Sequence, residues 1–138
     1  MAIVHAVKFI LWLKVQLLLA TWTVVIDTLS GNKKIDPCVV TYPLRVTSDW
    51  HITLFATSIT ITPGTMSLTI VDDDEENEQG DRHLIVHAVY GSKPDQVLAD
   101  LQKMEEMLAP HVAAIAHDLS AAKVEYPAPK ASSLGRKA

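Results

Sequence analysis

An apolar segment of about 20 residues near the N-terminus limits the possible folds of this chain more than any other feature. Residues Val7–Ile26 read VKFILWLKVQLLLATWTVVI, which as a helix is about as long as a bilayer is thick. Its twelve Leu, Ile, Val and Phe residues favour insertion by roughly 0.3–0.6 kcal/mol each, whereas a central lysine such as Lys14 opposes it by about 2.5–3.5 kcal/mol. Gln16 adds to that cost. The sequence therefore predicts a membrane helix that is stabilised when a neighbour accepts its polar groups.

Polar side chains on this helix form two separate stripes. At 100° per residue the stripes are Lys14, Thr21, Thr28 and Gln16, Thr23, Asp27. A single polar face would suit a helix lying on the membrane surface, and a cleaved signal peptide would have a shorter apolar core and a small-residue cleavage site. Those two alternatives stay open. Two separated stripes favour a helix that spans the bilayer between partners, so residues 1–30 are predicted to form a membrane anchor.

Basic residues are concentrated on the C-terminal side of the apolar segment. Lys33, Lys34 and Arg45 follow it, whereas only the chain's own amine precedes Lys8. The positive-inside rule then predicts that the rest of the chain lies in the cytoplasm. The single cysteine, Cys38, excludes an intrachain disulfide and agrees with a reducing compartment.

The sequence after the anchor predicts a linker, a small domain and a tail. Residues 31–38 contain Gly-Asn-Lys-Lys and Asp-Pro, which are typical of turns. Residues 39–122 carry patterns in the order strand, helix, strand, strand, helix, which predicts a two-layer α+β domain. Residues 123–138 are rich in Pro, Ser, Gly and Lys without periodicity, and are predicted to be disordered.

Two features of the predicted strands follow from single residues. Pro43 cannot donate a hydrogen bond to a ladder, so the first strand should lie at a sheet edge or be bulged. Alternation in Thr65–Val71 should place Met66, Leu68 and Ile70 on one face of a half-buried strand.

The predicted helices differ in their apolar surface. The helix that begins at Asp49 is apolar around most of its circumference, so it should pack on the sheet and on a second surface such as a membrane partner. The helix that begins near Pro94 has a clear polar side, formed by Asp100, Gln102, Lys103, Glu105 and Glu106. The acidic run of residues 72–82 between two strands predicts a solvated hairpin loop, since it lacks the spacing of a calcium loop.

The stretch LFATSITITPGTMSLTIV, followed later by a VHA strand, contains a specific pattern. Over about residues 39–108 it resembles the E-type component of the multi-subunit Mrp/Mnh-type monovalent cation/proton antiporters, in which an S-I-T-x-T-P-G-T motif and a V-H-A strand recur. The positions that match are Ser58, Thr60, Thr62, Pro63, Gly64, Thr65 and His87.

The resemblance implies an accessory subunit in a bacterial plasma membrane. Its partners would be the lipid bilayer and the other membrane subunits, and the assembly would exchange Na⁺ for H⁺. The motif residues and His87 would contact partner subunits, and Lys14 and Gln16 would be polar contacts inside the membrane. Similar subunits commonly have two or three spans, whereas one is found here, so either the anchor is short or the start of the chain has been lost.

Other combinations of polar residues give little support for catalysis or metal binding. His83 and His87 would lie about 13 Å apart on a strand, too far for one ion. Ser58 and His51 share a helix face, but a structural serine on a buried helix is the simpler interpretation. With a net charge of −4 the chain has no basic face for nucleic acid. We expect no cofactor, metal or catalytic residue. The alternative function is a membrane-tethered α+β binding or docking module.

Overall fold

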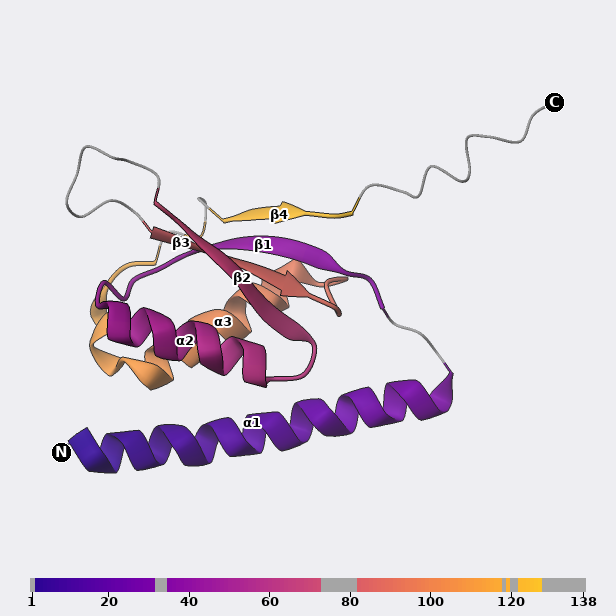
Figure 1. Cartoon of the computed structure of the whole chain (residues 1–138), viewed down its shortest axis with the longest axis horizontal. Coiled ribbons are helices and arrows are strands. Elements are labelled where there is room, and N and C mark those ends of the chain that lie inside the picture. Colours follow the sequence, from indigo (N-terminus) through magenta and orange to yellow (C-terminus); the bar gives the residue numbers. More distant parts are fainter. Residues whose placement is uncertain (1, 32–34, 73–81, 118, 120–121, 128–138) are drawn as a thin grey trace.

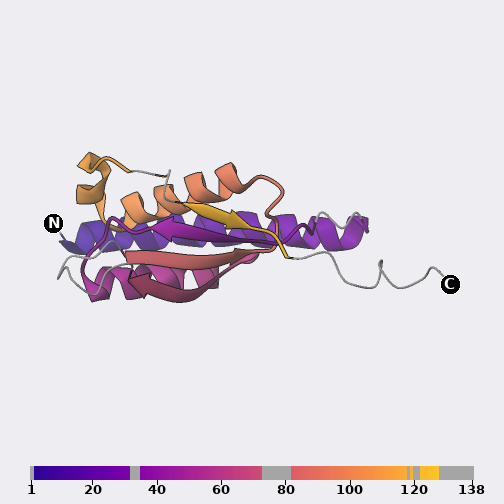
Figure 2. The ribbon, with the colours of Figure 1, turned by 90° about the horizontal axis from the view of Figure 1, so that it is seen from above.

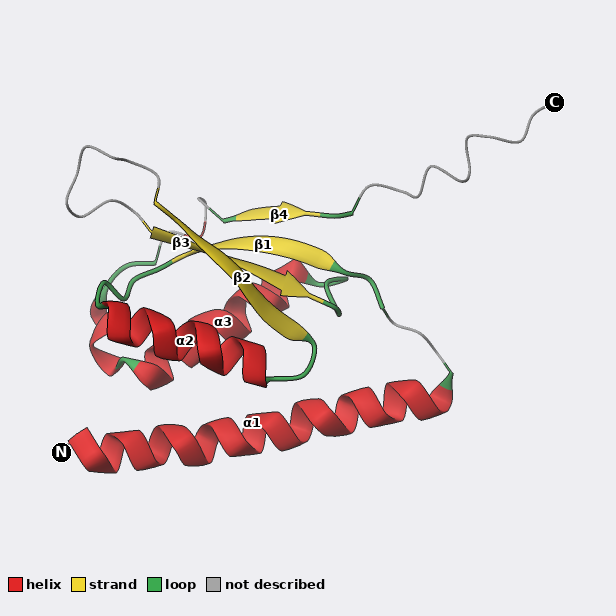
Figure 3. Ribbon diagram, in the orientation of Figure 1, coloured by secondary structure: helices red, strands yellow, loops and turns green. Residues whose placement is uncertain are grey.

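The computed structural model describes residues 2–31, 35–72, 82–117, 119 and 122–127. Its elements, coloured by type in Figure 3, are α1 (Ala2–Ser30), β1 (Cys38–Pro43), α2 (Asp49–Ile61), β2 (Thr65–Asp72), β3 (Arg82–Ala88), α3 (Pro94–Leu108), the 3₁₀ helix η1 (Pro110–Ala114) and β4 (Lys123–Glu125). The predicted order of strand, helix, strand, strand, helix after an apolar helix is confirmed. The acidic loop and part of the predicted linker, residues 73–81 and 32–34, lie outside the described residues.

The elements stack in layers. In Figure 1 the sheet lies above α2 and α3, and α1 runs below both helices. Seen from above in Figure 2, α1 lies between α2 and α3. The sheet and its two covering helices form the predicted α+β domain, and α1 adds a third layer on the helical side.

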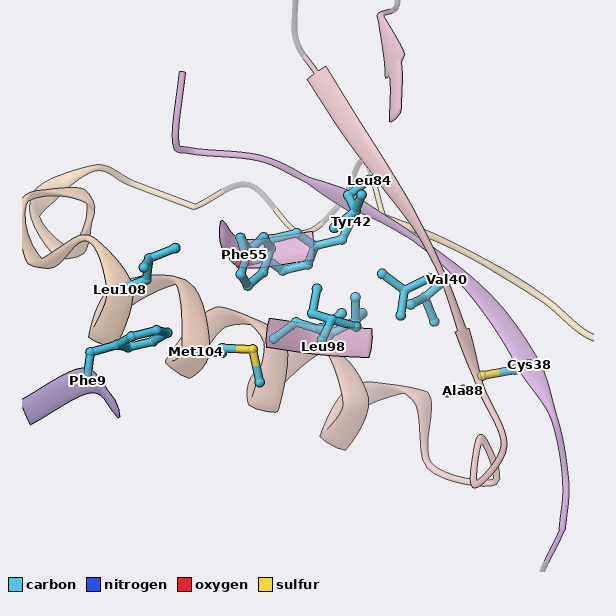
Figure 4. Packing of buried hydrophobic residues seen from close by; sticks show 13 residues of the cluster. Phe9, Cys38, Val40, Tyr42, Phe55, Leu84, Ala88, Leu98, Met104 and Leu108 are labelled. Carbon is cyan, nitrogen blue, oxygen red and sulfur yellow. The ribbon is translucent and has the colours of Figure 1, made fainter. Parts of the chain in front are cut away.

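The four strands pair antiparallel in the order β2-β3-β1-β4. One face of the sheet is closed by the helices, because alternate residues of β1 and β3 bury apolar or aromatic side chains there. Tyr42 and Phe55 pack with ring centroids 5.7 Å apart, and Phe9 brings α1 into the same cluster. Figure 4 shows Met104 and Leu108 completing the cluster from α3.

β1 lies inside the sheet, so the predicted edge position or bulge is wrong. β3 pairs along the whole strand, and β4 pairs with Val39–Thr41. The Leu44 N–H donates to the Arg82 carbonyl of the β3 side at 2.8 Å. Since successive residues direct their N–H groups to opposite sides, the nitrogen of Pro43 points to the β4 side, beyond the end of β4. The missing donor therefore breaks no ladder bond.

β2 is an edge strand, and its predicted apolar face is wrong. The register with β3 shifts in the middle of β2. Met66 pairs with His87. Ile70 pairs with Leu84 on the core face. Because the two partners are three residues apart, Met66 and Ile70 lie on opposite faces. The irregularity interrupts the alternation that the sequence shows, and the apolar side chains of β2 stay about 40–50 % exposed, with Leu68 at 49 %.

A short strand replaces the beginning of the predicted disordered tail. Lys123–Glu125 form β4, and Val124 packs against the core. Three residues are too few to show a periodic pattern, and the strand forms because β1 has an open edge to pair with. Residues 128–138 of the predicted tail lie outside the described residues, and the boundaries of anchor, linker, domain and tail stay predictions.

Glu105 is fully buried, although the pattern of α3 predicts it on the polar side. Its carboxylate accepts hydrogen bonds from the Tyr42 hydroxyl at 2.8 Å and from Arg45 Nε at 2.9 Å. It also accepts the backbone N–H groups of Arg45 and Val46, at 2.7 and 3.1 Å. Burial raises the pKa of Tyr42, and the Glu105 carboxylate raises it further, so the hydroxyl stays a donor. This cluster ties the end of β1 to α3.

Candidate functional site

The motif turn, residues Thr62–Thr65, joins α2 to β2 and is closed by its own hydroxyl groups. Thr62 Oγ1 donates to the Ile59 carbonyl at 2.7 Å, and Thr65 Oγ1 donates to the same carbonyl at 3.0 Å. The two hydroxyl oxygens lie 2.8 Å apart. The Ile59 carbonyl also accepts the backbone N–H of Thr62 at 3.2 Å, so both hydroxyls reinforce the C-terminal end of α2.

Gly64 is required by geometry within this turn. Its φ is +99°, which L side chains rarely adopt, and an added Cβ would lie 3.2 Å from the Tyr90 ring. Its carbonyl accepts the N–H of Val89 at 2.8 Å, so the turn also holds the end of β3. Pro63 keeps Thr62 out of helical geometry, with φ −75° and ψ 128°, and thereby ends α2.

Hydroxyl groups on either side of the turn attach α2 to β2. Thr60 Oγ1 lies 2.8 Å from Ser67 Oγ, and Ser67 Oγ donates to the Ala56 carbonyl at 3.0 Å. Ser58 Oγ donates to the Leu54 carbonyl at 2.7 Å, inside the helix. The ring of His51 packs edge-on against His111 instead, with centroids 6.0 Å apart. Ser58 therefore has the structural role that the sequence favours.

A cavity of about 670 Å³ lies between α1 and the domain, and we call it the slot. Its walls include Trp12 and Ala20 of α1, the motif turn, Tyr90 after β3, and Leu101 and Met104 of α3. On the N-terminal side of the slot α1 packs into the core through Phe9. Towards its C-terminal end the Tyr90 hydroxyl donates to Asp27 at 3.4 Å. The slot is thus bounded by contacts between α1 and the domain.

The two polar stripes of α1 face different surroundings. Gln16, Thr23 and Asp27 all line the slot. Lys14 is exposed and is not among the lining residues, and its companion Thr21 is exposed as well. The predicted separation of the stripes is confirmed, and Lys14 and Gln16 face different surroundings. Large apolar residues such as Leu18, 70 % exposed, cover the outer side of α1.

His87 lies apart from the other motif residues. It is half-buried and pairs with Val39 on one side and Met66 on the other. The adjacent residue Ala88 is buried and lines the slot, so His87 points to the opposite face of the sheet. The structure therefore brings Thr62, Gly64 and Thr65 together at the slot, and separates His87 from them.

Sequence reasoning missed the polar residues that α3 and the residue just before it contribute to the slot. Lys93, Asp100 and Lys103 line it, together with Gln96. Burial raises the pKa of Asp100, and nearby Lys103 partly offsets this effect. Their spacing on one side of a helix was visible, but nothing local indicated that α1 would lie opposite. Within the described part of the chain, no three His, Cys, Asp or Glu residues gather closely enough to hold a metal ion.

By length and composition α1 can cross a membrane. Within Val4–Ser30 the most apolar window of 18 residues has a mean hydropathy of 1.9, and only 6 % of that window is buried by the rest of the chain. The family described as Na⁺/H⁺ ion antiporter subunit (MNHE) matches residues 1–110. The match includes α1 and every strand except β4.

Two curated relatives, both E-type subunits of Na(+)/H(+) antiporters, show the same similarity over shorter stretches. The relative from Alkalihalophilus pseudofirmus is 29 % identical over 86 residues, covering 62 % of this chain and 50 % of the relative. The relative from Bacillus subtilis is 38 % identical over 58 residues, covering 42 % of this chain and 37 % of the relative. The chain thus spans half of the first relative's length or less.

A solved structure extends the similarity to the fold. A chain in the structure of the Mrp complex from Dietzia sp. DQ12-45-1b is 30 % identical, with a TM-score of 0.56 over 79 % of this chain and 94 % of that one. The motif residues that the sequence analysis singled out fall within the family match. This chain belongs to the Na⁺/H⁺ ion antiporter subunit family.

Proposed function

We propose that this chain is an accessory, E-type subunit of a multi-subunit monovalent cation/proton antiporter in a bacterial plasma membrane. The observation that carries the proposal is the likeness to a chain of the Mrp complex over 94 % of that chain. The assembly would exchange Na⁺ for H⁺, and this chain would support its assembly and stability. The domain is assigned to the cytoplasmic side, because the basic residues follow α1.

An accessory role agrees with the arrangement of polar groups. The hydroxyls of Thr62 and Thr65 bond to each other and to the Ile59 carbonyl of α2. Lys14 is exposed on one side of α1, while Gln16 lines the slot on another, so the two do not form a continuous path for ions. We assign Lys14 a pairing role with an acidic group of a partner subunit. No catalytic role is proposed.

The surfaces proposed to contact partner subunits are the outer side of α1 and the exposed side of α2. Trp50 and Ile61 of α2 are 68 % and 50 % exposed. Between them the Thr57 hydroxyl donates back to the Thr53 carbonyl at 2.7 Å, so this side offers few free donors to water. Such a surface suits an apolar partner. The motif turn would act by holding α2 in place for that contact.

The proposal is tested by purification through a tag placed after Ala138, in mild detergent, with mass spectrometry of the proteins that co-elute. Large polytopic antiporter-like subunits should be recovered in a fixed ratio. Trp50→Asp should lower their recovery, whereas Lys123→Asp, on exposed β4, should not. If the wild-type chain elutes alone from the membrane fraction, the proposal is wrong.

The second candidate is a membrane-tethered binding module unrelated to ion transport. The slot favours it, because a cavity of about 670 Å³ lies within the range of small-molecule sites, about 300–1,000 Å³. Recovery of the chain alone, with a bound small molecule, would support this candidate over the antiporter role.

A further inference from the structure

The slot is lined by both apolar and polar side chains. Its apolar lining comes from both helices and includes Trp12, Ala20, Ile26, Val97, Leu101 and Met104. Its polar lining comes from α1, from the motif turn and from α3, and its two lysines, Lys93 and Lys103, lie on and just before α3. A cavity with both kinds of lining fits an amphipathic ligand, which has an apolar chain and a polar head.

Both lysines of the slot lie on its α3 side. Lys93 and Lys103 are exposed, and among the described residues neither has a carboxylate oxygen within 4.0 Å. Two carboxylates also line the slot. Asp27 accepts the Tyr90 hydroxyl at 3.4 Å and Asp100 lies on α3, so two carboxylates balance the two lysines in formal charge. Because neither carboxylate pairs with a lysine within 4.0 Å, both ammonium groups are available to a phosphate group.

The slot opens onto the side of α1 that carries exposed apolar residues. Trp22 and Ile26 line the slot and are nevertheless 66 % and 50 % exposed. They continue directly into the outer surface that includes Leu18 and Leu29, 70 % and 82 % exposed. Where partner subunits leave the part of this surface beside the slot in contact with lipid, a ligand enters the slot sideways from the bilayer, without crossing water.

We propose that the slot binds a membrane phospholipid, with an acyl chain between Ala20 and Met104 and the phosphodiester near Lys93 and Lys103. A phosphodiester presents anionic oxygens that would accept hydrogen bonds from both lysines. The bound lipid would fill the space between α1 and the domain, and the motif turn would form part of its site. The inference rests on the membrane location in the proposed function, but not on which subunits are its partners.

The test is the phospholipid content of the full-length chain purified in mild detergent, determined by native mass spectrometry and phosphorus assay. The wild-type chain should retain phospholipid in a fixed ratio after extensive washing. Exchanging both lysines, as Lys93→Glu with Lys103→Glu, should reduce its affinity for added phosphatidylglycerol about tenfold or more, because charge-assisted hydrogen bonds to the phosphate are lost. Lys123→Glu, an equal charge change on exposed β4, should leave the affinity unchanged.

Adding three lipids in turn separates recognition of the phosphate from recognition of the rest of the lipid. Phosphatidylglycerol and phosphatidylethanolamine should both raise the thermal midpoint of the wild-type chain, and monoolein, which lacks phosphate, should not. An equal effect of monoolein would overturn the proposal. Ala20→Trp should block the slot and abolish lipid retention. The lysine exchanges lie at exposed positions, so circular dichroism can confirm that those variants stay folded.

The same eluates separate this inference from the proposed function. Fixed phospholipid without partner subunits would reject only the accessory role in the antiporter. Partner subunits without phospholipid would reject only the lipid site. If Ala20→Trp releases a partner subunit while lipid retention is unchanged, the slot holds a segment of that partner, and the phospholipid proposal is wrong.

Discussion

Individual residues of this domain carry charge in places where water cannot reach. The Arg45 guanidinium and the Glu105 carboxylate are both buried, and they meet at 2.9 Å. Burial by itself lowers the pKa of Arg45, but its bonds to Glu105 outweigh this effect and raise it. A buried pair of this kind is stable only while both partners and their hydrogen bonds are present.

Replacing Glu105 should therefore be among the most damaging changes in the domain. Glu105→Ala leaves a buried guanidinium and the Tyr42 hydroxyl without their acceptor, and should cost about 3–5 kcal/mol of unfolding free energy. Chemical denaturation in detergent would measure this loss. Glu106→Gln is the matched control, since its side chain is one-third exposed, and it should cost less than about 1 kcal/mol. Equal losses for the two variants would contradict the prediction.

The hydrogen-bonded carboxylate of Glu106 should make the stability of the domain depend on pH. Hydrogen bonds from Gln102 and Arg45 lower its pKa in the folded state. Its contribution is therefore fully present above the unfolded pKa of about 4.3, and is lost as the pH falls through the lower folded value. The difference in stability between wild type and Glu106→Gln should be constant near neutral pH and shrink below about pH 4. A difference independent of pH from 7 to 3 would rule out this contribution.

A comparison of substitutions at Gly64 and Gly31 separates the stability cost of backbone strain from the cost of steric crowding. Both have positive φ, +99° and +64°, but only Gly64 has a neighbour close to a new Cβ, the ring of Tyr90 at 3.2 Å. Gly31→Ala should cost about 1 kcal/mol for the backbone conformation alone. Gly64→Ala should cost about 2–3 kcal/mol, because Tyr90 must also shift. Denaturation of both variants tests this prediction. Equal losses of unfolding free energy would show that the Tyr90 ring can move aside without cost.

At the scale of elements, the main role of the motif is to hold α2 against β2, the edge strand of the sheet. Thr60 and Ser67 connect the two elements across the turn, and the Gly64 carbonyl extends the connection to β3. β2 would otherwise be held only by β3, since it lies at the edge. A helix fixed to an edge strand in this way keeps one side turned outward, towards the proposed partners.

The Thr60–Ser67 contact should appear as a coupling energy. In a double-mutant cycle of Thr60→Val and Ser67→Ala, the coupling should be about 0.5–1.5 kcal/mol, as for hydrogen-bonded neighbours. A parallel cycle of Thr57→Val with Ser67→Ala should give a coupling near zero, because the Thr57 hydroxyl bonds within α2. Similar coupling in the two cycles would show that the contact is not specific.

At the scale of the whole molecule, one thiol reports on the integrity of the sheet. Cys38 is fully buried at the start of β1, and a Cβ on Gly91 would overlap its sulfur. Burial raises the pKa of this thiol, and Asp36 raises it further, so its reactive thiolate is scarce. The position couples β1 to the segment that follows β3.

Cys38 should react with an aromatic disulfide reagent only as fast as the domain unfolds globally. Under native conditions its rate should rise with denaturant as the unfolding rate does. Ser92→Cys, at an exposed site beside the slot, should add a thiol that reacts at once. Fast reaction of Cys38 itself in the folded protein would reveal local opening between β1 and the segment after β3.

The order of elements, the anchor stripes and the motif turn could be predicted, because each depends on neighbours in the chain. Helical spacing alone separates Lys14 from Gln16, and Pro63 followed by Gly64 ends α2 wherever the domain lies. The motif turn and His87 also lie within the matched stretch of the family, but their proposed contacts with partners are not tested by the fold.

Burial of Glu105, the irregular pairing of β2, the strand β4 and the slot could not be predicted. Each depends on a segment distant in sequence: Arg45 for Glu105, β3 for β2, β1 for β4, and α1 for the slot. A local pattern shows whether a side chain is polar, but not whether a distant donor will meet it. The sequence by itself therefore determined which elements form, apart from β4, and which family the chain belongs to. The tertiary structure alone decided which charges are buried and where a ligand could enter, since both depend on contacts between segments far apart in the chain.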